Sequence, residues 1–260
     1  MSVLSHLQDT SSKLVLSDTE NANIGTSITT LETRLVNYFG TEIKEKFQFG
    51  SNTRNTILPR KVDEASDVDY MVVFDNSGNY KPQTFLNKLK MFVETKYSTS
   101  EIYQSSPTIV LQLNHIKFEL APAYRNWGIL YIPAPRTAVP DWISTDPTGF
   151  NSTLIEKNKS NNFLIKPTVR LLKYWNVLND KVYSSFGLEQ KIVSNSYFFC
   201  TNLKDYFYSA VESLQTFGLS DTKKQKVEKA KQIVANTKKY EADNMPFTAG
   251  EEIKKLIPSI

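Results

Sequence analysis

Residues 66–74 read Ser-Asp-Val-Asp-Tyr-Met-Val-Val-Phe, so two carboxylates open a segment that is otherwise apolar. The β-branched and aromatic residues predict a strand that is buried along most of its length. Side chains alternate between the faces of a strand, which places Asp67 and Asp69 on the same face. Two neighbouring carboxylates repel each other unless a positive group lies between them, and a divalent cation meets that need. The segment predicts a sheet with a candidate metal site, with ordinary acids at an exposed strand end as the alternative.

The charges are divided unevenly along the 260 residues. Residues 1–150 carry 14 basic and 16 acidic side chains, and residues 151–260 carry 17 and 11. An acidic part and a basic part suit a site that binds metal ions on one side and polyphosphate on the other. A solvated Lys-rich helix over 221–239 explains the same counts more simply. Composition alone therefore leaves both interpretations open.

Cysteine and histidine are scarce, which excludes several classes of site. The single Cys200 cannot form an internal disulfide, and His6 and His115 are too few for a zinc cluster or a histidine-based catalytic triad. No run approaches the roughly 18 apolar residues of a membrane span. Polar residues interrupt the first nine positions, where a signal peptide needs a continuous apolar region. We expect a cytoplasmic protein that does not insert into a membrane.

The pattern of apolar residues predicts strands mainly in the first part of the chain and helices in the second. Ser17 and Glu20 form a capping-box pattern before a long amphipathic helix over 18–45. Strands are predicted at 47–49, 68–74, 108–113, 116–120 and 129–132, with a helix at 82–97. Further helices are predicted at 148–159, 163–178, 185–193, 197–217, 221–240 and 248–257. The fold class is α+β, with a mixed-sheet catalytic core at 1–150 that includes the long N-terminal helix, a helical lobe at 151–260, and a cleft between them.

Two further motifs accompany the acid pair. Gly50-Ser51 directly follows a short apolar strand, and a glycine there allows close approach of the backbone to a ligand, while the Ser51 hydroxyl can bond phosphate oxygens. As an isolated dipeptide it would be an ordinary turn. In the strand 116–120, Ile116, Phe118 and Leu120 face the core, which turns Glu119 to the other side. Glu119 could then complete a set of three carboxylates.

In combination these motifs resemble the nucleotidyltransferase superfamily that includes DNA polymerase β. Phe49-Gly-Ser-x-x-Arg-x-Thr, Ser66-Asp-Val-Asp-Tyr and Glu119-Leu-Ala-Pro-Ala are similar to the bacterial cGAS/DncV-like nucleotidyltransferases, the CD-NTases. In the second part, Arg170-Leu-Leu-Lys-Tyr-Trp-Asn and Ser185-Phe-Gly-Leu-Glu resemble that family's lysine helix and serine-aromatic segment. The resemblance extends over about residues 24–260. It implies a polymerase-β-like nucleotidyltransferase core packed on a C-terminal helical lobe that closes a donor-nucleotide cleft.

The resemblance also implies roles for particular residues. Asp67, Asp69 and Glu119 would bind two Mg²⁺ ions, for which Mn²⁺ could substitute, and would direct two-metal phosphoryl transfer. Gly50, Ser51, Lys173, Ser185 and Phe186 would bind nucleotide: Lys173 and Ser185 through the donor phosphates, and Phe186 by stacking on the base. For Lys173 the alternative is an exposed helix lysine, and for Phe186 it is a core position. Glu119 departs from the Asp frequent at this position in cyclic-nucleotide synthases.

The implied function is template-independent synthesis of cyclic di- or oligonucleotides from nucleoside triphosphates, with release of pyrophosphate. In the family this reaction belongs to antiphage defence (CBASS), and the nucleotide product acts on a downstream effector. One alternative is a transferase that adds nucleotides to RNA 3′ ends, such as those of tRNA, or to a protein. Another is a catalytically silent nucleotide sensor. Base preference, linkage and ring size cannot be obtained from motif spacing.

Overall fold

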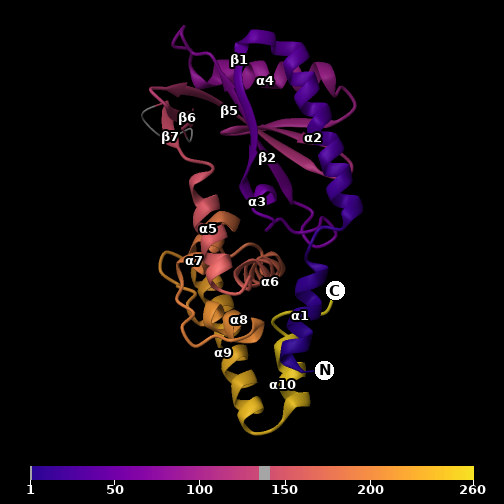
Figure 1. The fold of residues 1–260 in the computed structure, drawn as a ribbon, viewed down its shortest axis with the longest axis vertical. Coiled ribbons are helices and arrows are strands. Elements are labelled where there is room, and N and C mark those ends of the chain that lie inside the picture. The colour runs from indigo at the N-terminus through magenta and orange to yellow at the C-terminus, as the bar shows by residue number, and fades with distance from the viewer. Residues whose placement is uncertain (1, 135–140) are drawn as a thin grey trace. The chain divides into compact units, whose positions relative to one another are not determined.

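The computed structural model describes residues 2–134 and 141–260, which form two compact units (Figure 1). The sheet unit consists of the described residues of Ser17–Arg54 and Ala65–Asn151. The helical unit consists of the residues up to Leu16 together with Asn55–Glu64 and Ser152–Ile260. These units differ from the contiguous parts 1–150 and 151–260 expected from the sequence. Two segments of the first part pack with the helices of the second.

The long N-terminal helix of the sheet unit is α2 (Asp18–Phe39). The capping box is confirmed, because the Ser17 hydroxyl accepts from the Glu20 amide at 3.2 Å and the Ser17 amide donates to Glu20 Oε2 at 2.8 Å. The helix ends earlier than predicted. Gly40 has a φ of +53°, a conformation that ends a helix readily, and the next residues form the short 3₁₀ turn η1 (Gly40–Glu42).

Among the described residues, seven strands form one sheet in the order β1-β2-β5-β4-β3, with β6 pairing to β5 and β7 pairing to β6. Their bounds are β1 (Ile43–Phe49), β2 (Asp67–Phe74), β3 (Glu101–Ser105), β4 (Thr108–Gln112), β5 (Lys117–Asn126), β6 (Ile129–Pro133) and β7 (Trp142–Thr145). β2 and β5 run parallel and the remaining pairs are antiparallel, so the predicted mixed sheet is confirmed. β3 and β7 were not predicted, because both are short and carry several polar residues.

Helices α2 and α4 (Pro82–Lys96) pack on one face of this sheet. Phe74 of β2 stacks on Phe85 of α4 with a centroid separation of 5.0 Å and meets Phe39 of α2 edge-on at 5.2 Å. On the same face, the Tyr70 hydroxyl donates to Glu32 at 2.9 Å. Because side chains alternate, the other residues of β2, which include both of its aspartates, face the opposite side of the sheet.

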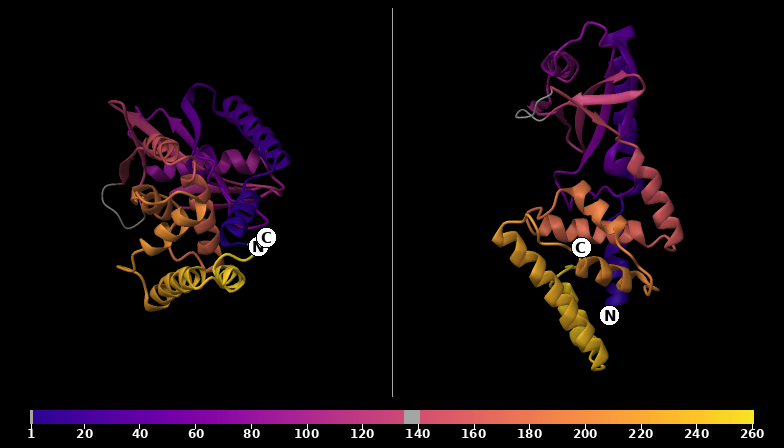
Figure 2. Two further views of the ribbon diagram at one scale, coloured as in Figure 1. Left: turned by 60° about the horizontal axis from the view of Figure 1, so that its bottom comes forward. Right: turned by 90° about the vertical axis from the view of Figure 1, so that its left-hand side faces the viewer.

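The helical unit contains α1 (Val3–Lys13), most of α5 (Gly149–Ser160), α6 (Ile165–Leu178), α7 (Ser185–Ser194), α8 (Leu203–Glu212), α9 (Asp221–Ala242) and α10 (Pro246–Lys254). α1 packs against α6, α8 and α10, and its His6 ring forms a hydrogen bond of 2.7 Å with the Ile257 carbonyl. α9 and α10 run side by side (Figure 2). The predicted helices are present, but α8 is shorter than 197–217, because Asn202 caps it by accepting from the Lys204 amide at 3.0 Å.

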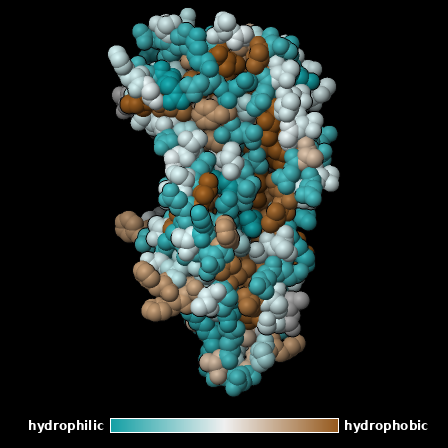
Figure 3. Space-filling model, viewed as in Figure 1, coloured by the Kyte–Doolittle hydropathy of each residue, from teal (hydrophilic) through white to brown (hydrophobic). Residues whose placement is uncertain are grey.

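The lysine-rich helix α9 has a solvated face, as the simpler interpretation of the charge distribution predicts. Its buried residues are mainly apolar and include Val227, Ala230 and Val234. Figure 3 shows a largely hydrophilic surface where Figure 1 labels α9. No helix in the described part of the chain combines the length and the apolar character needed to cross a membrane. The basic surplus of the second part is thus largely a property of this helix surface.

Candidate active site

The three predicted carboxylates lie on one face of two adjacent strands of the sheet unit. In the parallel pairing of β2 with β5, Asp67 stands opposite Lys117 and Asp69 opposite Glu119. Paired residues project from the same face, and neighbouring strands are about 4.8 Å apart. On the opposite face, Phe118 and Val68 are buried, as predicted. Strand alternation and register therefore bring the three acids to the same end of one sheet face.

An ammonium group lies among these acids. Lys117 Nζ is 3.1 Å from Asp67 Oδ2 and 2.9 Å from Glu119 Oε1, and the Lys117 side chain is 13% exposed. Burial raises the pKa of Asp67, and the charge of Glu119 raises it further. Burial works to lower the pKa of Lys117, but its bonds to Glu119 and Asp67 prevail and raise it. No group of three or more His, Cys, Asp or Glu side chains among the described residues is arranged to hold a metal ion.

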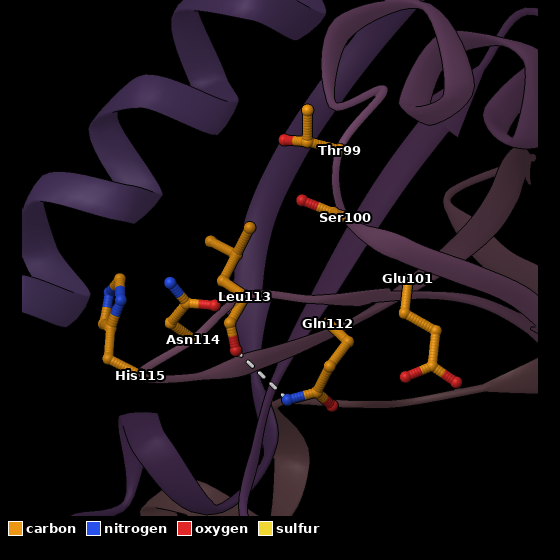
Figure 4. A pocket seen from close by; sticks show the side chains of 7 residues that line it. All are labelled: Thr99, Ser100, Glu101, Gln112, Leu113, Asn114 and His115. Carbon is orange, nitrogen blue, oxygen red and sulfur yellow. Dashed lines mark hydrogen bonds between the residues drawn. The ribbon is translucent and has the colours of Figure 1, made fainter.

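The same row of side chains continues into a polar cavity. Across the sheet, Lys117 pairs with Gln112 of β4, which in turn pairs with Glu101 of β3. Both line a cavity of about 570 Å³, together with residues 99–100 and 113–115 (Figure 4). Gln112 Nε2 donates to the Leu113 carbonyl at 3.1 Å. Gln112 and Glu101 thus extend the polar face by two strands from the carboxylates.

Gly50 allows the close approach of backbone and carboxylate that shapes the site. It begins the short helix α3 (Gly50–Thr53) and has a φ of +77°. A Cβ atom at this position would lie 1.8 Å from Asp69 Oδ2. Ser51 follows on α3 and is partly buried. The structure shows that the glycine admits Asp69, and its close approach to a ligand remains a prediction.

We expect Gly50→Ala to lower the free energy of unfolding by about 1–3 kcal/mol, because the left-handed backbone is unfavourable for alanine and Asp69 must move. Urea unfolding followed by circular dichroism measures this effect. Gly25→Ala in α2 is the matched control. Its Cβ would meet nothing within 4 Å, and alanine favours a helix, so its stability should be equal or higher. Equal stability of Gly50→Ala and the wild type would contradict the close packing of Gly50 against Asp69.

Lys173 of α6 is buried within the helical unit rather than exposed. Its Nζ donates to the Thr56 carbonyl at 2.9 Å and lies 3.3 Å from Glu189 Oε1 of α7. The Thr56 hydroxyl donates to the same carboxylate oxygen at 2.8 Å. The side chain of Glu189 is 0% exposed. The alternative of an exposed lysine is therefore wrong, and a contact of Lys173 with phosphate remains a prediction.

Two other cations of α6 were not singled out from the sequence. Lys166 and Arg170 are four residues apart, so they share a helix face. Arg170 Nη1 donates to the Asn55 carbonyl at 3.0 Å, and Arg170 Nε is buried with no hydrogen-bond partner among the described residues. Burial lowers the pKa of Arg170, and burial together with the charge of Arg170 lowers that of Lys166. Only tertiary packing distinguishes these cations from ordinary helix residues.

The serine-aromatic segment begins α7. Ser184, rather than Ser185, caps this helix by accepting from the Gly187 amide at 3.2 Å. Ser185 is then the first helical residue, and its side chain is not the capping group. The Phe186 residue is 46% exposed, so the interpretation of this ring as a core residue is wrong. A role of Ser185 or Phe186 in nucleotide binding remains a prediction.

Comparison with known proteins adds an independent observation. Residues 1–158 match the Second Messenger Oligonucleotide or Dinucleotide Synthetase (SMODS) domain, which is more than half of the chain. The chain belongs to the SMODS family. A cyclic AMP-AMP-AMP synthase of Acinetobacter sp. is 22% identical over 176 residues, or 65% of this chain and 51% of that protein. A probable cyclic nucleotide synthase of Bacillus cereus is 24% identical over 212 residues, or 66% of this chain and 62% of that protein.

The fold of this SMODS protein is shared with solved structures. Escherichia coli CdnC, solved with ATP, superposes with a TM-score of 0.75 at 10% identity and covers 100% of this chain and 98% of its own. This likeness confirms the predicted nucleotidyltransferase fold. The chain spans only about half to three fifths of the length of the Acinetobacter and Bacillus relatives.

The acidic face of the SMODS protein has the chemistry of a divalent-cation site. Carboxylate oxygens are the ligands that Mg²⁺ and Mn²⁺ prefer. A cation, the Lys117 ammonium, already lies within 3.1 Å of two of the carboxylates. Against the two carboxylates of Asp67 and Glu119, this one ammonium leaves an excess of negative charge. The oxygen donors of these residues therefore fit, by their chemistry, the divalent metal that this family typically needs, although their present arrangement is not a ready metal site.

Proposed function

We propose that the chain is a template-independent nucleotidyltransferase that makes cyclic di- or oligonucleotides from nucleoside triphosphates. The observation that carries this proposal is the register of β2 and β5, which sets Asp67, Asp69 and Glu119 on one face in a SMODS protein. The Acinetobacter relative, a cyclic AMP-AMP-AMP synthase, and CdnC, solved with ATP, support the substrate class.

The reaction forms one bond and breaks another at phosphorus. A ribose hydroxyl attacks the α-phosphorus of a triphosphate, the bond to the β-phosphate oxygen breaks, and pyrophosphate leaves. The hydroxyl proton passes to solvent or to a carboxylate of this face. Asp67, Asp69 and Glu119 would hold two Mg²⁺ ions, or Mn²⁺ in their place. When bound, the ions supply Lewis-acid stabilisation of the attacking and leaving oxygens. No protein nucleophile is required.

We propose that Lys166 and Arg170 of α6 bind the donor phosphates, together with Lys173 of the same helix and Ser185 at the start of α7. No carboxylate lies within ion-pair distance of Lys166 or Arg170 in the described part of the chain. A phosphate oxygen would supply the partner that Arg170 Nε lacks. Ser51 would bond a phosphate oxygen, and the Phe186 ring, which is 46% exposed, would stack on a base.

The proposed biological role is second-messenger synthesis in antiphage defence (CBASS), in which the product acts on a downstream effector. It rests on the family of the chain and on the names of its relatives. Transfer of nucleotides to RNA or to a protein, and a silent sensor, are the competing outcomes. The presence of all three acids argues against a silent sensor.

Incubation of the purified chain with the four ribonucleoside triphosphates tests the proposal. We expect release of pyrophosphate that depends on Mg²⁺ or Mn²⁺, and a product that resists phosphatase because it has no free end. Mass spectrometry with nuclease digestion identifies bases, linkage and ring size. Radiolabelled triphosphate is also mixed with total RNA. Label in RNA or protein, in place of a small cyclic product, would favour the competing transferase, and no label transfer would favour the sensor.

A further inference from the structure

Lys117 occupies the position between the first and third carboxylates that the proposed mechanism reserves for a divalent cation. It stands directly opposite Asp67 on the neighbouring strand and two residues before Glu119 on its own strand. Its Nζ approaches Asp67 Oδ2 at 3.1 Å and Glu119 Oε1 at 2.9 Å. One ammonium therefore binds both acids.

This pair of contacts differs from a surface ion pair. The side chains of Lys117, Asp67 and Glu119 are 13%, 27% and 26% exposed, so solvent screens their charges only partly. Both contacts are within hydrogen-bond distance and come from a single donor group. Without this ammonium, the carboxylates of Asp67 and Glu119 would have no ion-pair partner among the described residues, and their mutual repulsion is unfavourable. Lys117 thus stabilises the metal-free arrangement.

An ammonium and a divalent metal ion compete for the same pair of carboxylates. Mg²⁺ requires oxygen ligands at about 2.0–2.1 Å in a nearly ideal octahedron. An ammonium held against the same oxygens would lie beside the divalent ion, and the two positive charges would repel each other. Binding of a metal ion to the oxygens that Lys117 now contacts, Asp67 Oδ2 and Glu119 Oε1, therefore favours release of Lys117 from at least one of them.

We propose that Lys117 is an internal counter-cation that holds Asp67 and Glu119 in the metal-free protein and that a divalent ion must displace. The inference rests on the proposed function, since it assumes that these acids bind the metal. It makes Lys117 a positioning residue that sets the metal concentration at which the site fills.

Binding of Mn²⁺ in the absence of nucleotide, followed by the electron paramagnetic resonance signal of the free ion, tests this proposal. We expect Lys117→Met to bind Mn²⁺ about tenfold more tightly than the wild type, because a competing unit charge is gone. Its metal-free form should melt at a lower temperature, and Mn²⁺ should restore the loss. Lys117→Arg keeps the charge and should bind Mn²⁺ within about threefold of the wild type.

A measurement on the wild type does not depend on the folding of a variant. Acetylation followed by mass spectrometry should show Lys117 reacting faster when Mn²⁺ is present, since its ammonium is then released. Lys90, an exposed residue of α4, is the control and should not change. Equal or weaker Mn²⁺ binding by Lys117→Met, no Mn²⁺ binding by either protein, or unchanged acetylation of Lys117 would each overturn the inference. Cyclic product from the wild type alongside such a result would leave the proposed function intact.

Discussion

Asp69→Asn should lower the rate of nucleotide transfer by at least about 10³-fold, which corresponds to roughly 4 kcal/mol of transition-state stabilisation. Asp69 pairs with Glu119 across the parallel strands and lies against the backbone of Gly50. Asparagine has nearly the same shape, so this packing survives while the charge of the metal ligand is lost. Pyrophosphate release at saturating triphosphate measures the effect.

The free energy of unfolding separates a catalytic role from a structural one. Removal of one of several neighbouring negative charges should leave the stability of metal-free Asp69→Asn equal or higher. Asp75→Asn is the matched control. Asp75 directly follows the other end of β2, pairs with Lys44 at 3.4 Å and should tolerate the change with full activity. Full activity of Asp69→Asn, or a marked loss of its metal-free stability, would contradict the site assignment.

Glu189→Ala should lower the free energy of unfolding by about 3–5 kcal/mol, because it leaves the buried ammonium of Lys173 without its carboxylate. It also removes the acceptor of the Thr56 hydroxyl. Glu189 is fully buried, so water cannot replace the lost group without rearrangement. Urea unfolding measures the change. Glu251→Ala, which breaks an exposed pair with Lys254, should be nearly neutral.

A double variant then separates the two roles of Lys173. Lys173→Met combined with Glu189→Leu replaces the buried pair by apolar side chains and should recover most of the stability lost in Glu189→Ala. If this folded protein is active, Lys173 acts by positioning α6 and α7. If it is folded but inactive with a raised KM for triphosphate, Lys173 contacts phosphate. A Glu189→Ala protein as stable as the wild type would contradict the buried pair itself.

Local sequence patterns sufficed to predict on which face of its strand each acidic side chain lies, because the alternation of side chains along a strand is a local property. The period of two predicted that Asp67 and Asp69 share a face, and Glu119 lies between the buried Phe118 and Leu120. The capping box of Ser17 and Glu20 is equally local, since its two hydrogen bonds span three residues. Such features depend on dihedral angles and near neighbours, which the sequence specifies directly.

The parts that could not be predicted depend on partners far away in the chain. The pairing of β2 with β5 sets the distance from Lys117 to Asp67. The spacing of residues along the sequence does not predict which lysine lies opposite an acid on another strand. The burial of Lys173 likewise depends on Thr56 and Glu189, which come from separate segments. Arg170 is distinguished by a buried nitrogen, and burial of a single atom has no sequence signature.

The discontinuous units affect how this chain can fold during synthesis. The chain passes from one unit to the other after Leu16, Arg54, Glu64 and Asn151. α1 is therefore synthesised before its partners α6, α8 and α10, which follow it by more than a hundred residues. Its apolar residues Val3 and Leu7 have no native surface to cover them until these helices have been made. The native packing of α1 thus has to wait for helices that lie far along the chain.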